Sequence, residues 1–233
     1  MTDPTSERVY ISPVAYRAQV TITNPDFINS PDIGMGSPIF RIPEFVRRGK
    51  TRRPPGYTEW EIVQPDTELR YHWAPPEKIK KEFPSDFRGH LKVEGTQVRY
   101  EITYKNIGDE PASDGVSLFC LQAGTMREFH DPEQVNTFVW VNDRFVSRSE
   151  NRRPTTRNLI VKRSAETGFV LAVVTEPSSG VGGNPNIWPS CIHSNPDWGT
   201  LQPGEQATVH GAVYFFRGSL DDVMERYLRD FGP

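Results

Sequence analysis

Apolar and polar residues alternate along the stretch from residue 89 to residue 121. Between residues 98 and 104 every second position is Val, Tyr or Ile, and the positions between them are charged or hydroxylated. A repeat of two places the two sets on opposite faces of a sheet, which predicts a half-buried strand. The same pattern begins at Leu91 before a turn at 94–96, and it resumes at 116–121 after a polar break. The stretch therefore predicts a β-hairpin followed by a third strand.

Similar patterns predict strands on both sides of this stretch. Single strands are expected at 17–23 and 207–216, and hairpins at 58–63 with 68–73, 137–141 with 144–147, and 159–163 with 169–175. Asn142 and Asp143 tolerate the positive φ that the tight turn of the second hairpin needs. The segment 176–200 is rich in Gly, Pro, Asn and Ser, so it predicts a long loop of the kind that is often functional.

The end of the chain predicts one amphipathic helix, 219–231. Ser219 is a suitable N-cap, and Asp222 three residues later completes a capping box. Apolar residues recur at helical spacing and form one face, which is expected to pack on the strands. These residues are Leu220, Val223, Met224, Tyr227, Leu228 and Phe231.

Many short strands followed by one helix predict a mainly β protein, an antiparallel β-sandwich of the supersandwich kind with one C-terminal amphipathic helix. We expect residues 58–233 to form this β-sandwich domain. Residues 1–57 are expected to be an irregular N-terminal segment with one strand, packed on the sandwich or extending it.

Composition and charge narrow the classes of partner. The net charge of −3 argues against nucleic acid, and no apolar run approaches the roughly 20 residues that span a bilayer. The N-terminus has no signal-peptide pattern, which favours a cytoplasmic location. A basic run at 47–53 is interpreted as a solvated loop, as a phosphate-binding patch, or as a source of one or two arginines that reach into a pocket and hold a carboxylate.

The two cysteines are too few for a disulfide framework. Cys120 lies inside an apolar strand, which predicts a buried free thiol.

Motifs for nucleotide binding, zinc proteases and serine hydrolases are absent from the sequence. Two polar loops remain as candidates for chemistry. The first, 124–136, follows a predicted strand and contains Arg127, Glu128, His130 and Asp131. Arg127 could bind a carboxylate and His130 could transfer a proton, with Asp131 or Glu128 orienting it. The alternative is an ordinary charged surface loop.

The second loop, 184–199, contains Trp188, Cys191, His193, Asp197 and Trp198. An indole ring covers the apolar face of a pyranose while polar groups bind its hydroxyls, so this loop could bind a sugar. The alternative is that the tryptophans hold the loop against the sandwich.

A metal site is a third option. No cofactor is expected. Binding of a divalent metal is kept as an alternative, because inward-facing histidines on a barrel would form a cupin-like site. The ligands would then be His90, His130 and His193, although none of them forms a local HxH pair.

Two segments resemble bacterial β-sandwich proteins. Residues 98–111 are similar to a strand–Asn-x-Gly-Asp/Glu-x-Pro–strand element, and residues 198–205 are similar to the turn before the last long strand. Both elements occur in galactose-mutarotase-like sugar-active proteins and in immunoglobulin-like adhesion modules. The resemblance implies a sandwich and favours a carbohydrate ligand, and it would imply a concave sheet face with His and acidic groups.

The leading hypothesis is a carbohydrate-active β-sandwich protein, a lyase or epimerase acting on an acidic sugar. His130 or His193 would be the general acid/base, Arg127 would hold a carboxylate, and Trp188 and Trp198 would form the stacking surface. The alternatives are a non-catalytic module that binds carbohydrate or protein, and a cupin-like metalloenzyme. A homo-oligomer is left open.

Overall fold

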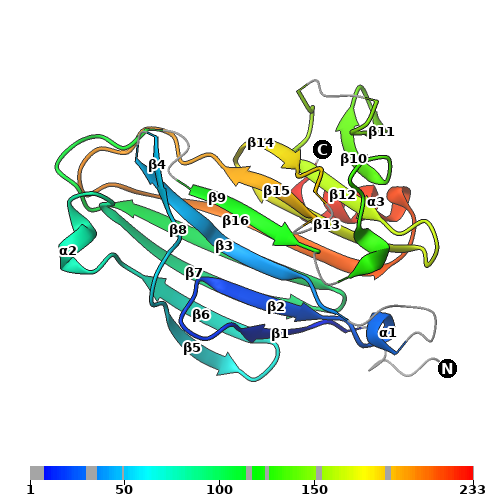
Figure 1. The fold of residues 1–233 in the computed structure, drawn as a ribbon, viewed down its shortest axis with the longest axis horizontal. Helices are drawn as coiled ribbons and strands as arrows, with labels where there is room; N and C mark the ends of the chain where they lie inside the picture. The colour runs from blue at the N-terminus through cyan, green and yellow to red at the C-terminus, as the bar shows by residue number, and fades with distance from the viewer. Residues whose placement is uncertain are drawn as a thin grey trace.

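Two antiparallel sheets pack face to face in the computed structural model, which describes residues 8–29, 36–48, 50–113, 117–123, 126–150, 154–186 and 190–232 (Figure 1). Sheet A has the order β1 (Tyr10–Pro13), β2 (Gln19–Thr23), β3 (Ile39–Arg48), β9 (Ser117–Gln122), β15 (Cys191–Pro196) and β14 (Ser178–Gly183), and β4 (Thr51–Arg53) pairs with β3. Sheet B has the order β11 (Arg144–Ser147), β10 (Thr137–Val141), β12 (Leu159–Arg163), β13 (Phe169–Glu176), β16 (Gln206–Arg217), β8 (Gln97–Asn106), β7 (Ser85–Glu94), β6 (Glu68–Trp73) and β5 (Glu59–Gln64).

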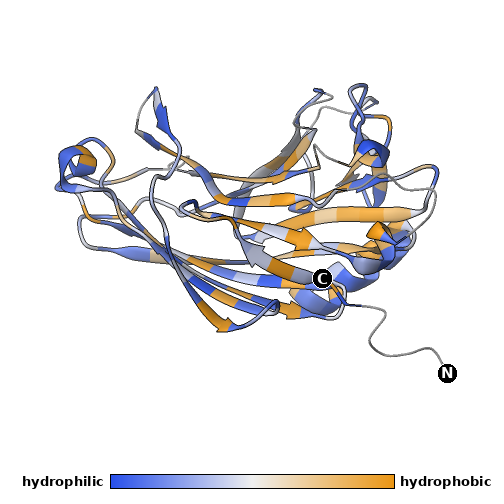
Figure 2. Cartoon of the chain, turned by 60° about the horizontal axis from the view of Figure 1, so that its bottom comes forward, coloured by the Kyte–Doolittle hydropathy of each residue, from blue (hydrophilic) through white to orange (hydrophobic). Residues whose placement is uncertain are grey.

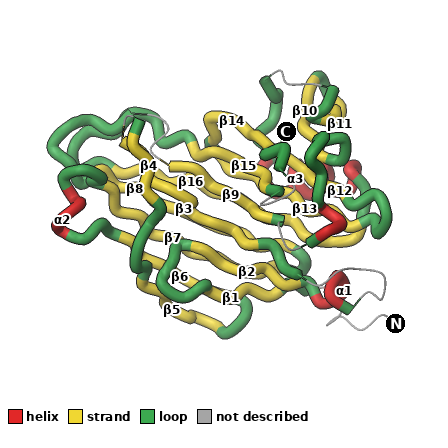
Figure 3. Tube along the Cα trace, viewed as in Figure 1, coloured by secondary structure: helices red, strands yellow, loops and turns green. Residues whose placement is uncertain are grey.

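The helical elements are short except for the last one (Figure 3). They are α1 (Pro25–Ile28), α2 (Glu77–Lys80), η1 (Arg127–Phe129) and α3 (Leu220–Phe231). Among the described residues, no helix has the length and apolar character needed to cross a membrane.

The expected β-sandwich with a C-terminal helix is confirmed, and the alternation in sequence corresponds to burial. In β8 the alternating residues Tyr100, Ile102 and Tyr104 are buried between the sheets. The hairpin β10–β11 has the expected bounds, and its turn residues Asn142 and Asp143 have φ values of 49° and 59°. Figure 2 shows the apolar segments of the strands stacked through the middle of the molecule.

Helix α3 covers the outer face of sheet B, as its apolar face predicts. Val223, Met224 and Tyr227 pack against outward-facing apolar residues of β12, β13 and β16. The capping box is present: Ser219 accepts from the N–H of Asp222, and the Asp222 carboxylate accepts from the N–H of Ser219.

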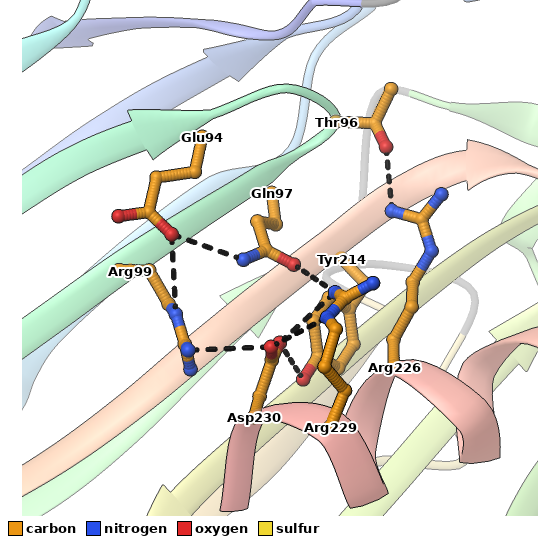
Figure 4. Close-up of polar contacts among 8 residues, drawn as sticks. All are labelled: Glu94, Thr96, Gln97, Arg99, Tyr214, Arg226, Arg229 and Asp230. Carbon is orange, nitrogen blue, oxygen red and sulfur yellow. Dashed lines mark hydrogen bonds and ion pairs between the residues drawn. The ribbon is translucent and has the colours of Figure 1, made fainter.

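A buried carboxylate fixes the end of α3 to the sheet (Figure 4). The side chain of Asp230 is 4% exposed, and its oxygens lie 3.3 Å from Arg99 Nη2 and 3.0 Å from Arg229 Nε. The Tyr214 hydroxyl donates to the same carboxylate at 2.8 Å. Burial, together with the negative charge of Asp230, raises the pKa of Tyr214. This network joins α3 to β8 and β16.

The structure differs from the sequence prediction in two places. Within residues 1–57 it has β1, β3 and β4 as well as the expected strand at β2, so this segment supplies much of sheet A. Residues 176–200 are not one long loop, because they contain β14 and β15. Of these strands, β4 and β14 pair with neighbours in the chain but have no apolar alternation, and β3 and β15 pair with β9, which is distant in sequence. The sequence left open which sheet contains the strand after the β7–β8 hairpin, and this strand, β9, lies in sheet A.

Candidate functional site

The outer face of sheet A lies between two raised hairpins. In Figure 2 the β3–β4 hairpin rises at one end of this face and the β10–β11 hairpin at the other. Between them β3, β9 and β15 run side by side. The outward side of these three strands, which we call the floor, therefore lies between the two hairpins.

Strand register places three reactive side chains in one row on this floor. Arg41 of β3 pairs with Cys120 of β9, and Cys120 pairs with His193 of β15. Their neighbours Phe40, Phe119 and Ile192 face the core, so the row faces outward. Gln122 and Cys191 form the adjacent pair. The backbones of neighbouring strands are about 5 Å apart, so the Cα atoms of Arg41 and His193 are separated by about 10 Å.

Cys120, Cys191 and His193 form a compact cluster. Their ligand atoms, two Sγ and one imidazole nitrogen, all lie within 4.8 Å of one another, and Cys191 Sγ is 3.1 Å from His193 Nε2. Both thiols are free and buried, which confirms the expectation for Cys120. Hydrogen bonding by Cys120 and by His193 lowers the pKa of Cys191 to about 4, against the opposing effect of burial. Burial raises the pKa of Cys120. The two sulfurs and the imidazole therefore form one connected polar group on the outer face of sheet A.

A cleft of about 480 Å³ adjoins this row on the β4 side. Its walls carry two exposed aromatic rings, Tyr16 and Tyr57, whose centroids are 5.6 Å apart. Three arginines line it, Arg17, Arg41 and Arg53. We call this feature the Arg–Tyr cleft; its lining residues come from the segments 16–19, 41–44 and 53–57.

Glu44 connects the Arg–Tyr cleft to the cysteine cluster. Its Oε1 accepts from Arg41 Nη1 at 3.2 Å and from Gln122 Nε2 at 3.4 Å. The carboxylate thus orients one guanidinium of the cleft and one amide beside Cys191. With three guanidinium groups and one carboxylate among its lining residues, the cleft is positively charged.

In the first predicted loop, 124–136, Asp131 has a structural role. Asp131 is buried, and its carboxylate accepts from the N–H of Val135, the N–H of Asn136 and the hydroxyl of Thr137. It caps the entry to β10. Because all these contacts are internal, the structure gives Asp131 a role in shaping the loop and does not aim it at solvent.

The other candidates of this loop lie on or after η1. Arg127 is exposed, and Glu128 and His130 are half-buried. The Ser190 hydroxyl donates to the carbonyl of Phe129 at 2.9 Å, so this loop meets the chain just before Cys191. The start of the second predicted loop therefore meets the first loop at one end of the sandwich, whereas Asp197 and Trp198 follow β15 at its other end.

The tryptophans do not form a stacking surface as far as the structure describes them. Trp198 is buried among Phe87, Tyr104 and Phe119, and its indole N–H donates to Ser117 Oγ at 3.0 Å. The expectation that it stacks on a sugar is corrected, because both faces of a core indole are already covered. Trp188 lies outside the described residues. Asp197 accepts from the N–H of Gly199 and shapes the turn before β16.

The expected histidine metal set is also corrected. His90 lies on the outer face of sheet B and His193 on the outer face of sheet A, with the core between them. They cannot bind one ion together with His130. The group that does converge includes His193 with two cysteines.

The outer face of sheet B contains a wider hollow of about 580 Å³. Two histidines that line it face carboxylates: His72 Nε2 is 2.9 Å from Asp86, and His90 Nε2 is 2.8 Å from Glu68. On the same face of the sheet, His210 Nδ1 is 3.4 Å from Glu101. Most of these side chains are well exposed. Mutually paired, solvated charges are typical of a polar sheet surface, so we favour sheet A.

The sequence did not identify Tyr16, Tyr57, Arg17, Arg41 or Glu44 as residues of a site. It also did not predict that Cys191 lies beside Cys120. A partial signal existed in the suggestion that an arginine of the 47–53 run reaches a pocket, since Arg53 does line the cleft. For the cysteine cluster, Cys191 and His193 stand two residues apart, the spacing of one strand face.

The fold is shared with solved structures of low sequence identity. The Slr1438 protein of Synechocystis has a TM-score of 0.58 and 11% identity over 92% of this chain and 94% of its own. A galactose mutarotase-like protein of Lactobacillus casei has a TM-score of 0.56 and 10% identity over 90% of this chain and 97% of its own. An α-N-acetylgalactosaminidase of Bifidobacterium bifidum has a TM-score of 0.56 and 9% identity over 95% of this chain and 37% of its own.

No protein-family model matches the sequence, and the search of curated proteins gives no match. The structural likenesses confirm the resemblance to galactose-mutarotase-like proteins at the level of the fold. The chain has the β-sandwich fold found in carbohydrate-active proteins.

Proposed function

We propose that this protein binds an acidic carbohydrate on the outer face of sheet A. The observation that carries the proposal is the Arg–Tyr cleft, where two exposed tyrosine rings stand beside three arginines. An aromatic ring stacks on the apolar face of a pyranose, and a guanidinium group binds a carboxylate through two parallel hydrogen bonds. A neutral sugar would need only the rings, so the arginines favour a uronic acid.

The position of the cleft beside Cys191 and His193 favours an enzyme. Arg41 would hold the carboxylate of the sugar, and the row Arg41–Cys120–His193 would place the ring near a group that accepts and returns a proton. Proton removal next to a carboxylate held by arginine leads to a lyase or an epimerase. The solved structures of this fold that are named for sugars are consistent with a carbohydrate ligand.

Binding is tested by calorimetric titration with uronic-acid oligosaccharides and their neutral counterparts. Arg53→Met should weaken binding of the acidic sugars by about 10- to 100-fold, the range for losing a hydrogen bond to a charged group, and leave neutral sugars unchanged. Tyr57→Ala should weaken both series by about 10-fold.

The matched control for the arginine is Arg52→Met. Arg52 is the neighbouring exposed arginine, lies over the ring of Phe45 and does not line the cleft. Equal losses for Arg52→Met and Arg53→Met, or no preference for acidic sugars, would contradict the proposed site.

The second candidate is a binding module without catalysis, which the exposed tyrosine pair alone would support. Product analysis separates the two. A lyase creates a carbon–carbon double bond conjugated to the carboxylate, which absorbs in the ultraviolet, and an epimerase changes the anomeric or ring-proton NMR signals. In an enzyme, His193→Gln should abolish product and keep sugar affinity. Sugar binding without any product would favour the module.

A further inference from the structure

We propose that Cys120, Cys191 and His193 bind a transition-metal ion of the zinc class on the outer face of sheet A. The ligand atoms would be Cys120 Sγ, Cys191 Sγ and His193 Nε2. The inference does not depend on sugar binding, because none of the three ligands lines the Arg–Tyr cleft, although His193 is also the proposed acid/base.

The first argument is geometric. In a tetrahedral zinc site with Zn–S near 2.3 Å and Zn–N near 2.0 Å, ligand atoms lie roughly 3.5–3.8 Å apart. The three atoms here already lie within 4.8 Å of one another, and Cys191 Sγ and His193 Nε2 are 3.1 Å apart. Small side-chain rotations would therefore bring them to binding distances.

The second argument is rigidity. Cys120 lies at the centre of sheet A, and Cys191 and His193 lie on the adjacent strand, two residues apart on one face. Ladder hydrogen bonds between β9 and β15 fix the relative positions of all three Cα atoms. Sites built on strands hold ligands more accurately than sites on loops.

The third argument is ligand chemistry. Thiolate and imidazole ligands select zinc, copper(I) or iron over magnesium and calcium. Metals bind the thiolate form of cysteine, so the two sulfurs would bind the ion with loss of their protons. Asn184 and Gln122 contact the two sulfurs and would act as outer-sphere partners that hold them in place.

Three protein ligands leave one position of a tetrahedral ion for water or substrate, which is the pattern of catalytic rather than structural zinc. Among the described residues, no fourth His, Cys, Asp or Glu joins this group of ligand atoms. With a metal bound, His193 would be a ligand, and the ion would supply Lewis-acid chemistry at the open position.

The test uses the whole protein, produced without a histidine tag and kept reduced. The metal-free protein is titrated with Co²⁺, whose bonds to thiolates give a charge-transfer band in the near ultraviolet. We expect one equivalent to bind with this band and Zn²⁺ to displace it. Cys191→Ser should remove about half of the band, because one of two thiolates is lost.

His193→Gln should weaken Co²⁺ binding more than about 100-fold, beyond the 10- to 100-fold loss typical of an outer-sphere substitution. The control is His90→Gln on the opposite sheet, which should change nothing. Co²⁺ binding without the charge-transfer band, or a band unchanged in Cys191→Ser, would overturn the proposal.

A measurement on the unmodified protein guards against variants that do not fold. X-ray absorption of the zinc-loaded protein should show two sulfur neighbours at about 2.3 Å and nitrogen or oxygen at about 2.0 Å. A shell of nitrogen and oxygen alone would overturn the site even if sugars bind. If Arg53→Met loses sugar binding but keeps the cobalt band, the substitution has changed the Arg–Tyr cleft and left the metal site intact.

Discussion

Lys162 is a lysine buried inside the sandwich. It lies on β12, is 1% exposed, and its Nζ lies 3.2 Å from Thr137 Oγ1. Thr137 in turn donates to Asp131. Burial lowers the pKa of Lys162 to about 8, although the negative charge of Asp131 acts in the opposite direction. The folded protein therefore releases this proton more easily than the unfolded chain does.

This difference predicts a rise in stability with pH. Between about pH 8 and pH 10.5 the unfolded state binds more protons at Lys162 than the folded state, so the free energy of unfolding increases with pH. From about pH 8 to pH 9.5 the gain from this group should be about 1.5 kcal/mol. Lys162→Met should remove it, as measured by urea unfolding at several pH values.

The control for this experiment is Lys105→Met, an exposed lysine on the same sheet, which should keep the wild-type slope. The range stops below pH 10 because burial raises the pKa of Tyr71 and Tyr100, whose ionisation on unfolding lowers stability at higher pH. Parallel slopes for wild type and Lys162→Met would show that this amine is not the titrating group.

At the scale of the element, α3 is attached by charge as well as by its apolar face. Arg99 and Tyr214 reach Asp230 from the sheet, and Arg226 Nη1 donates to Thr96 Oγ1 at 2.7 Å (Figure 4). The Asp230 side chain is nearly inaccessible, so its loss would leave Arg99 without its buried partner.

We predict that Asp230→Asn lowers the free energy of unfolding by about 2 kcal/mol, because hydrogen bonds to a buried charged group are lost without a change of shape. The matched substitution Glu225→Gln, at an exposed position of the same helix, should change stability by less than about 0.5 kcal/mol. Chemical denaturation followed by circular dichroism measures both. Equal effects would mean that the network in Figure 4 contributes nothing beyond a surface charge.

At the scale of the whole molecule, the first 57 residues supply nine of the 36 buried residues that form the main core in the described part of the chain. Phe27 packs against Phe215 of β16 with ring centroids 5.2 Å apart, and Phe40 packs against Tyr100 of β8 at 5.1 Å. The buried Asn24 amide donates to the Phe215 carbonyl at 2.7 Å. Without these residues, β9 would lose its partner β3 and the inner face of sheet B would be partly uncovered.

We therefore predict that residues 58–233 alone do not fold cooperatively. Their near-ultraviolet circular dichroism should be weak and their urea unfolding should lack a sigmoidal transition. A native-like spectrum with cooperative unfolding would instead establish 58–233 as an independent domain.

A point variant tests the same dependence in the full chain. Phe40→Ala should cost about 3–5 kcal/mol, the range for removing a buried aromatic ring. Ile62→Ala, at a position 59% exposed on β5, should cost less than about 0.5 kcal/mol.

The local elements of this protein follow from its amino-acid sequence alone. Alternation predicted β7 and β8, turn residues located the β10–β11 hairpin, and helical spacing with the Ser219 capping box placed α3. These features depend on residues close in the chain, and burial on one face leaves a periodic trace in them. They were enough to predict a β-sandwich with a C-terminal helix.

Which strands share a sheet and which side chains meet depends on the three-dimensional fold. Ser178–Gly183 has no apolar alternation, and it is a strand because it pairs with β15, the next strand in the chain. Arg41, Cys120 and His193 form a row through the registers of β3, β9 and β15, and Trp198 is core because the sheets close over it. The pairings of β9 with β3 and with β15 join segments distant in sequence, so the pattern of residues within each strand does not indicate them.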